Sequence, residues 1–203
     1  MVDNAIAKVP SAGPPAGFVI STPANWTRLD FDTLGDEKEM ARQVEAQTRA
    51  KRQPKQVSRE IARILALAAR SQEVAGLVFA AATYETDGKQ VLTANVTIVM
   101  RGPSEGTPTT LETIAAQLGA DPASKRSFGQ VNLRGGRALR AETLSAEPSG
   151  TPGLDVAMLT VQYFVCTPDE SHWAIITCGS PSVAFRDPLE RLFDLIANSF
   201  EFR

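Results

Sequence analysis

The sequence predicts an α+β fold in which a mainly antiparallel sheet of about six to seven strands is sandwiched by helices. Strand-like apolar runs follow one another in pairs joined by short polar or glycine-rich segments, as in antiparallel hairpins. Three segments carry apolar side chains at helical spacing, so they are expected to cover the sheet. With 203 residues and 43% hydrophobic content, the chain suits one domain, expected over 18–203.

The N-terminal third is expected to hold an arm, a strand and a helical insertion. Residues 1–17 are rich in Pro, Ala and Gly and lack the apolar core of a signal peptide, so a flexible arm is expected. The run 18–21 is the first predicted strand. A helical insertion is expected over 36–74, where Pro54 separates two helices. The second helix has an apolar stripe made of Val57, Ile61, Ile64, Leu65 and Ala68.

Three hairpins are predicted after the insertion. Asp87-Gly88 is among the strongest turn signals, and Gly135-Gly136 permits the positive dihedral angles of a tight turn. The strands pair 77–84 with 91–100, 128–133 with 138–144, and 156–166 with 172–178.

Two further helices have start signals of their own. Thr109 and Glu112 form a capping box, and Gly119 ends that helix. Asp187 is expected to cap the last helix, with Pro188 at its first position. The expected buried face of the last helix consists of Leu189, Leu192, Phe193, Ile196 and Phe200.

Three short motifs resemble the PsbP-like α/β/α sandwich proteins. They are the run FVISTP at 18–23 with Trp26, the hairpin LRGGRA at 133–138, and the ending FDLIANSF at 193–200. That group includes an extrinsic photosystem II subunit, a Ran-binding nuclear import factor, bacterial effector chaperones and actinobacterial lipoproteins. The resemblance implies a protein that binds other macromolecules and rarely catalyses, and it supplies no catalytic residue.

His172 and the two cysteines are the residues most suggestive of chemistry. His172 follows Asp169, Glu170 and Ser171, which suggests a catalytic triad. Adjacent turn residues cannot align a nucleophile, base and orienting group, however, so a structural His is favoured. A turn over 167–171 places Cys166 opposite His172 and Cys178 about 20 Å further along at ~3.3 Å per residue. We therefore expect two separate thiols in apolar strands, and no metal site.

Arg134, Arg137 and Arg140 surround the Gly-Gly turn. They could grip an anion, but a solvated hairpin tip is favoured because Arg137 and Arg140 lie on opposite faces of the strand by parity.

The segment 42–63 is the strongest candidate for a contact surface. It holds seven Lys or Arg residues against Glu45 and Glu60, in a chain whose net charge is -2. Such a segment suits an acidic surface of another protein or an anionic lipid surface. A solvated helical face that covers the sheet is the alternative. The candidate partner-binding residues are Arg42, Arg49, Lys51, Arg52, Lys55, Arg59 and Arg63.

The function expected from these patterns is that of a non-catalytic adaptor or chaperone-like protein. The alternatives are a small-ligand or lipid-binding domain with a pocket between helices and sheet, and an enzyme that uses dispersed carboxylates. Those carboxylates would be Asp30, Asp32, Glu85 and Asp155. No catalytic residue, cofactor or metal is expected.

Location and nucleic-acid binding follow from composition. No run approaches the ~18 apolar residues of a membrane span, so a cytoplasmic location is expected. The acidic net charge and the lack of aromatics in the basic segment argue against nucleic acid. The sequence does not fix the oligomeric state, so a homo-oligomer stays open.

Overall fold

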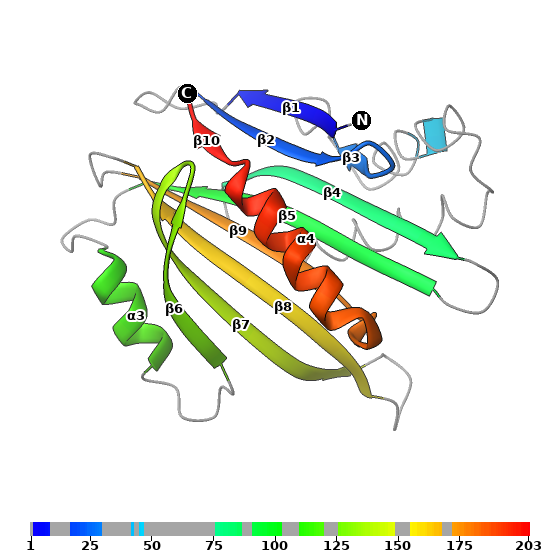
Figure 1. Cartoon of the computed structure of the whole chain (residues 1–203). Helices are drawn as coiled ribbons and strands as arrows, with labels where there is room; N and C mark the ends of the chain where they lie inside the picture. The colour runs from blue at the N-terminus through cyan, green and yellow to red at the C-terminus, as the bar shows by residue number, and fades with distance from the viewer. Residues whose placement is uncertain are drawn as a thin grey trace.

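A computed structural model describes residues 2–8, 17–29, 42, 45–46, 76–86, 91–102, 110–119, 126–148, 155–167 and 172–203. Every pairing between the described strands is antiparallel. The strands form two sheets, a large one crossed by a helix and a small one beside that helix (Figure 1).

The large sheet has seven strands in the order β3-β4-β5-β9-β8-β7-β6. The closing strand of the last predicted hairpin, β9, lies between β5 and β8, so the first and last hairpins join into one sheet. Its strands are β3 (Thr27–Leu29), β4 (Leu77–Thr86), β5 (Val91–Arg101), β6 (Arg126–Leu133), β7 (Gly136–Pro148), β8 (Asp155–Cys166) and β9 (Trp173–Ser180).

The small sheet joins segments from both ends of the described chain, in the order β1-β2-β10. Its strands are β1 (Val2–Lys8), β2 (Gly17–Pro23) and β10 (Glu201–Phe202). The backbone of Gly17 exchanges two hydrogen bonds with that of Arg203, at 3.1 and 2.9 Å. The flexible arm predicted over 1–17 therefore differs from the structure, in which residues 2–8 are a strand.

Two helices longer than one turn are present in full among the described residues, α3 (Leu111–Gly119) and α4 (Arg186–Asn198). A 3-10 turn, η2 (Val183–Phe185), leads directly into α4. Arg42, Glu45 and Ala46 are also helical, but the rest of the predicted insertion 36–74 lies outside the described residues.

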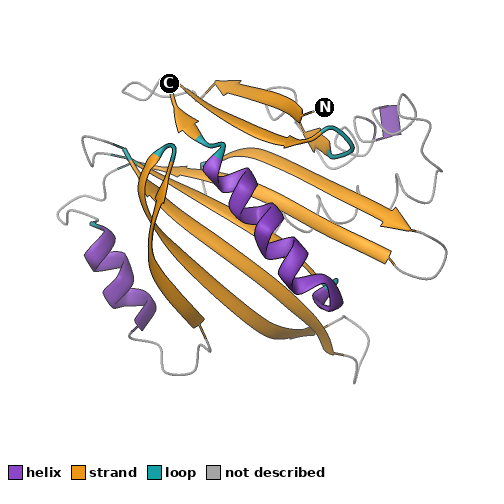
Figure 2. Ribbon diagram, viewed as in Figure 1, coloured by secondary structure: helices purple, strands orange, loops and turns teal. Residues whose placement is uncertain are grey.

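The described part of the chain is mainly β (Figure 2). The predicted antiparallel sheet is confirmed, whereas the predicted α+β class, with helices sandwiching the sheet, is wrong. Two reasons account for the error. The strands are longer than predicted, up to the 13 residues of β7, and the small sheet occupies part of the layer that helices were expected to fill.

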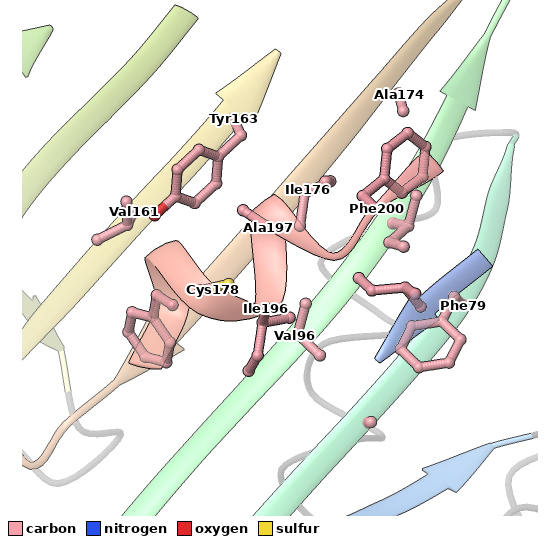
Figure 3. Packing of buried hydrophobic residues seen from close by; sticks show 14 of the residues in the cluster. Phe79, Val96, Val161, Tyr163, Ala174, Ile176, Cys178, Ile196, Ala197 and Phe200 are labelled. Carbon is pink, nitrogen blue, oxygen red and sulfur yellow. The ribbon is translucent and has the colours of Figure 1, made fainter. Parts of the chain in front are cut away.

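The core lies between the large sheet, α4 and the small sheet. Alternate residues of the central strands face this layer, because side chains point to opposite faces of a strand in turn. Ile196 and Ala197 of α4 pack among Val96, Ile176 and Cys178 of the sheet (Figure 3).

Aromatic rings connect the small sheet to this core. The rings of Phe18 and Phe200 stack at 5.5 Å, and Phe79 of β4 meets Phe18 edge-on at 6.3 Å. Trp26 is buried in the same cluster, whereas Trp173 is buried in a second cluster that includes Leu111 and Ile114 of α3.

The turn between β6 and β7 packs against the end of α4. A Cβ atom on Gly135 would lie 2.8 Å from the carbonyl oxygen of Phe200, so only glycine allows this approach. Gly136 has φ +128°, a conformation that favours glycine. The backbone N–H of Arg134 donates to Asn198 Oδ1 at 3.2 Å, which fixes the turn to the helix.

The predicted helix starts are displaced, by one residue for α3 and by two for α4. For α3, the N–H of Thr113 donates to Thr110 Oγ1 at 3.2 Å, while Thr109 lies outside the described residues. For α4, Asp187 lies inside the first turn and does not cap, because the preceding 3-10 turn places Phe185 at the cap position. Cys166 likewise pairs with Trp173 rather than with His172.

Candidate functional site

The densest group of ionisable side chains lies between α4 and β7. Arg140 and Glu142 alternate with buried neighbours on β7 and therefore share the face that α4 covers. Tyr163 lies directly opposite Arg140 on β8. Three charged residues recur at every fourth position of α4 and face these strands. We call the whole group the α4 ion-pair cluster, which consists of Arg140, Glu142, Tyr163, Arg186, Glu190 and Asp194.

Two arginines share three carboxylates in this cluster. Arg140 donates to Glu142 Oε2 at 2.9 Å and to Asp194 Oδ1 at 3.0 Å, and its Nη2 lies 3.8 Å from Glu190 Oε2. Arg186 pairs with the other oxygen of Glu142 and donates to Glu190 Oε1 at 2.5 Å. The side chain of Glu142 is only 8% exposed, so this carboxylate is buried between two guanidinium groups.

Tyr163 joins the cluster through its hydroxyl group. The hydroxyl donates to Asp194 Oδ1 at 2.5 Å, while the ring is part of the core (Figure 3). Burial raises the pKa of Tyr163 far above the ordinary value, and the bond to Asp194 adds to the shift. Tyr163 is therefore a hydrogen-bond donor at any physiological pH.

Charge balance keeps Glu142 ionised. Burial alone would raise its pKa, but hydrogen bonds from Arg140 and Arg186 outweigh burial and lower the pKa below the ordinary value. The pKa of Arg140 is raised in turn, because its bonds to Glu142 and Asp194 outweigh the opposing effect of its own burial.

The chemistry open to this cluster is therefore limited. Its carboxylates are occupied by arginines and a phenol. The contacts of Arg140 and Tyr163 with Asp194, and of Arg186 with Glu142, hold α4 to the sheet. The nearest thiol is that of Cys178, whose pKa burial raises, so it is a protonated core side chain rather than a nucleophile. Among the described residues, no group of three or more His, Cys, Asp or Glu side chains could hold a metal ion.

A second feature is the exposed edge strand β6, which the sequence did not single out. The two edges of the large sheet differ, since β3 has three residues and β6 has eight. In the described part of the chain, β6 hydrogen-bonds only with β7. Phe128 on this strand is 43% exposed, and a Cβ on Gly129 would meet nothing within 4 Å.

Most of the predicted basic segment lies outside the residues that the structure describes. Arg42 is helical and exposed, and it makes an interaction of its own. The other six predicted partner-binding residues lie outside the described residues: Arg49, Lys51, Arg52, Lys55, Arg59 and Arg63.

The three hairpin arginines do not converge. Arg134 is 73% exposed and lies 4.0 Å from Glu201, and Arg137 is exposed on the face opposite Arg140. Arg140 is only 20% exposed and belongs to the α4 ion-pair cluster, so the prediction of a solvated hairpin tip is wrong for this residue.

His172 and both cysteines fill structural positions. The hydroxyl of Thr167 accepts a hydrogen bond from the His172 backbone N–H at 3.0 Å and donates to its carbonyl oxygen at 3.2 Å. These bonds close the end of the β8–β9 hairpin. Cys166 and Cys178 are free thiols, as expected, while Asp169 lies outside the described residues.

Of the four dispersed carboxylates, the structure describes Glu85 and Asp155 and does not bring these two together. Glu85 is the penultimate residue of β4 and accepts a hydrogen bond from Asn25. Asp155 begins β8, and β5 and β9 lie between these strands. Three strand spacings separate the backbones by roughly 14 Å. Asp30 and Asp32 lie outside the described residues.

Comparison with protein-family models and with curated sequences gives no relative. No family model matches the chain, and no curated protein matches its sequence. The resemblance to PsbP-like proteins therefore stays a prediction. Among the residues that the structure describes, no helix is long and apolar enough to cross a membrane.

Proposed function

We propose that this protein is a non-catalytic binding module, of the adaptor or chaperone-like kind, that contacts an acidic surface of another protein. The observation that carries the proposal is the internal neutralisation of the α4 ion-pair cluster. Its arginines and carboxylates bind one another and hold α4 on the sheet, so the described body resembles a scaffold more than a reaction site.

The basic segment supplies the proposed contact. Its seven cationic residues stand against two acidic ones, and electrostatic complementarity of this kind selects and steers a protein partner. Two free cysteines agree with the reducing environment of the cytoplasm, which is the location we propose. The PsbP-like resemblance supports the same kind of function.

The test is affinity capture from the source cells with wild-type protein and two charge-reversal variants. In the first variant Arg49, Lys51 and Arg52 are each changed to Glu. In the matched control, three exposed arginines elsewhere, Arg101, Arg134 and Arg191, are changed to Glu.

We expect the first variant to lose at least tenfold of the captured partner, because exposed ion pairs contribute ~0.2–1 kcal/mol each and tenfold corresponds to ~1.4 kcal/mol. The control should stay within twofold of wild type, and capture should weaken as salt rises. Equal losses in both variants, or capture that is insensitive to salt, would contradict the proposal.

A further inference from the structure

We propose that β6 pairs with β6 of a second copy of this chain, in an antiparallel arrangement whose two-fold axis passes through Gly129. The partner is thus the protein itself, and the contact is strand addition at the edge of the large sheet. This inference is independent of the basic segment and of the partner proposed for it.

The first argument is that, in the part of the chain that the structure describes, β6 has none of the features within the strand itself that usually protect an edge. Edge strands of soluble proteins are typically short, bulged, or interrupted by charged side chains or proline. β6 has eight residues in unbroken register with β7, and the run SFGQVNL at 127–133 contains no charge and no proline. The opposite edge, β3, is protected by being three residues long.

The second argument concerns the backbone groups that point away from β7. Leu133 and Gly136 close a two-residue turn, so they form a hydrogen-bonded pair. Hydrogen-bonded and non-bonded pairs alternate along an antiparallel ladder. Every second residue of β6 therefore directs its N–H and C=O outward, namely Arg126, Phe128, Gln130 and Asn132.

The register follows from these outward groups. A two-fold axis through Gly129 sets Phe128 opposite Gln130 of the second copy, and Arg126 opposite Asn132. All four outward residues of each copy are then hydrogen-bonded. Shifting the axis by one residue in either direction leaves at least one of the four without a partner in the opposing β6. The Gly129 register is thus the one in which β6 is fully self-complementary.

Side chains fit the same arrangement. Phe128 projects to the face opposite α4, where its ring lies beside Gly119 of α3, and it is still 43% exposed. In this register Phe128 is the diagonal neighbour of Phe128 of the second copy, at ~7–8 Å, within reach of aromatic side chains. The two rings would bury each other's exposed surface. Gly129 lies at the axis on the other face, so no two identical side chains meet there.

Cysteine cross-linking tests the register directly. Gly129→Cys is built in a Cys166→Ser background, since a Cβ at Gly129 meets nothing within 4 Å in one copy. At the axis, the two Cα atoms of a non-bonded pair lie ~4.5 Å apart, which a disulfide can span. In the matched variant Asn132→Cys, the two cysteines would lie six residues apart along the strands, about 20 Å.

We expect oxidised glutathione to convert Gly129→Cys to a covalent dimer at least tenfold faster than Asn132→Cys. Equal rates, or no dimer with either variant, would overturn the proposal.

A charge swap tests the same contact without cysteines. Phe128→Lys/Gln130→Lys opposes like charges across the axis, whereas Phe128→Lys/Gln130→Glu opposes unlike charges at the same positions. Both variants lose the Phe128 rings and differ only in the charge at position 130. Sedimentation over a range of protein concentrations should therefore give a dimer dissociation constant at least tenfold weaker for the first variant than for the second. Circular dichroism confirms folding. A folded protein that is monomeric at high concentration, or a dimer that both variants leave unchanged, would overturn the proposal.

Discussion

The two sides of α4 hold the helix to the sheet by different means. One side is apolar and buries Leu189, Phe193, Ile196 and Ala197 against both sheets. The other side carries the charged residues of the α4 ion-pair cluster, whose geometry depends on particular atoms meeting. Burial of apolar surface is strong but non-directional, while charge-assisted hydrogen bonds are directional. We infer that the apolar side supplies most of the stability and the ionic side sets the rotation of the helix.

The strongest test of this division is Phe193→Ala. Phe193 is fully buried at the centre of the apolar side. Removing the ring should lower the free energy of unfolding by about 4 kcal/mol, through lost burial and the cavity left behind. Urea denaturation followed by circular dichroism measures the change, and an unchanged m-value serves as the control for two-state unfolding. If Phe193→Ala lowers the free energy of unfolding by less than a variant of the α4 ion-pair cluster does, the apolar side is not the main source of stability.

The next effect is expected from Glu142→Gln, which keeps the shape of the side chain but removes its charge. Arg140 and Arg186 would then face each other without the buried carboxylate. We expect a loss of about 2 kcal/mol, less than for a wholly buried pair because water reaches the half-exposed Arg186.

The difference in the free energy of unfolding between wild type and this variant should depend on pH. The pKa of Glu142 is lowered in the folded protein, so its contribution is full above the unfolded value of ~4.3 and is lost as the pH falls through the folded pKa. The difference between wild type and Glu142→Gln should be constant from pH 7 to pH 5 and should shrink below about pH 4. A difference that persists unchanged into strong acid would show that the charge is not responsible.

A smaller effect is expected from Tyr163→Phe. The ring keeps its packing, and only the hydrogen bond to Asp194 is lost. Asp194 is 52% exposed, so water can replace the phenol, and the loss should be about 1 kcal/mol. Thermal unfolding measures it. A loss as large as that of Phe193→Ala would mean that the ionic side dominates stability.

The smallest effect is expected from Leu195→Lys. Leu195 is 69% exposed on the outer surface of α4, away from both sides. The free energy of unfolding should change by less than about 0.5 kcal/mol. A larger loss would indicate that this surface is covered in the native state, and light scattering would show whether a second copy covers it.

Local patterns predicted the secondary structure of the described residues well. The alternation of apolar and polar residues located the three hairpins, because it depends only on neighbours two positions apart. The apolar face of α4 was also found from local spacing, because it depends only on residues three and four positions apart. Sheet order was not predicted, since β9 reaches its place between β5 and β8 through contacts distant in sequence.

The α4 ion-pair cluster was missed because its members are far apart in the chain. Arg140 and Asp194 are 54 positions apart, and neither has a sequence neighbour that signals the contact. The alternation of side chains along a strand did place Arg137 and Arg140 on opposite faces. This was a local indication that the two arginines have different surroundings. The fold class was predicted wrongly because no local pattern indicates that β1, β2 and β10 form a second sheet.

The close approach of Gly135 to Phe200 has a consequence for cooperativity. The tip of the β6–β7 hairpin rests on a residue whose ring stacks on Phe18 of the small sheet. Opening the tip would therefore remove support from Phe200, and loss of that ring would loosen β2 and β10 together. Although they belong to different sheets, we expect the hairpin tip and the small sheet to open together as one subglobal unfolding unit.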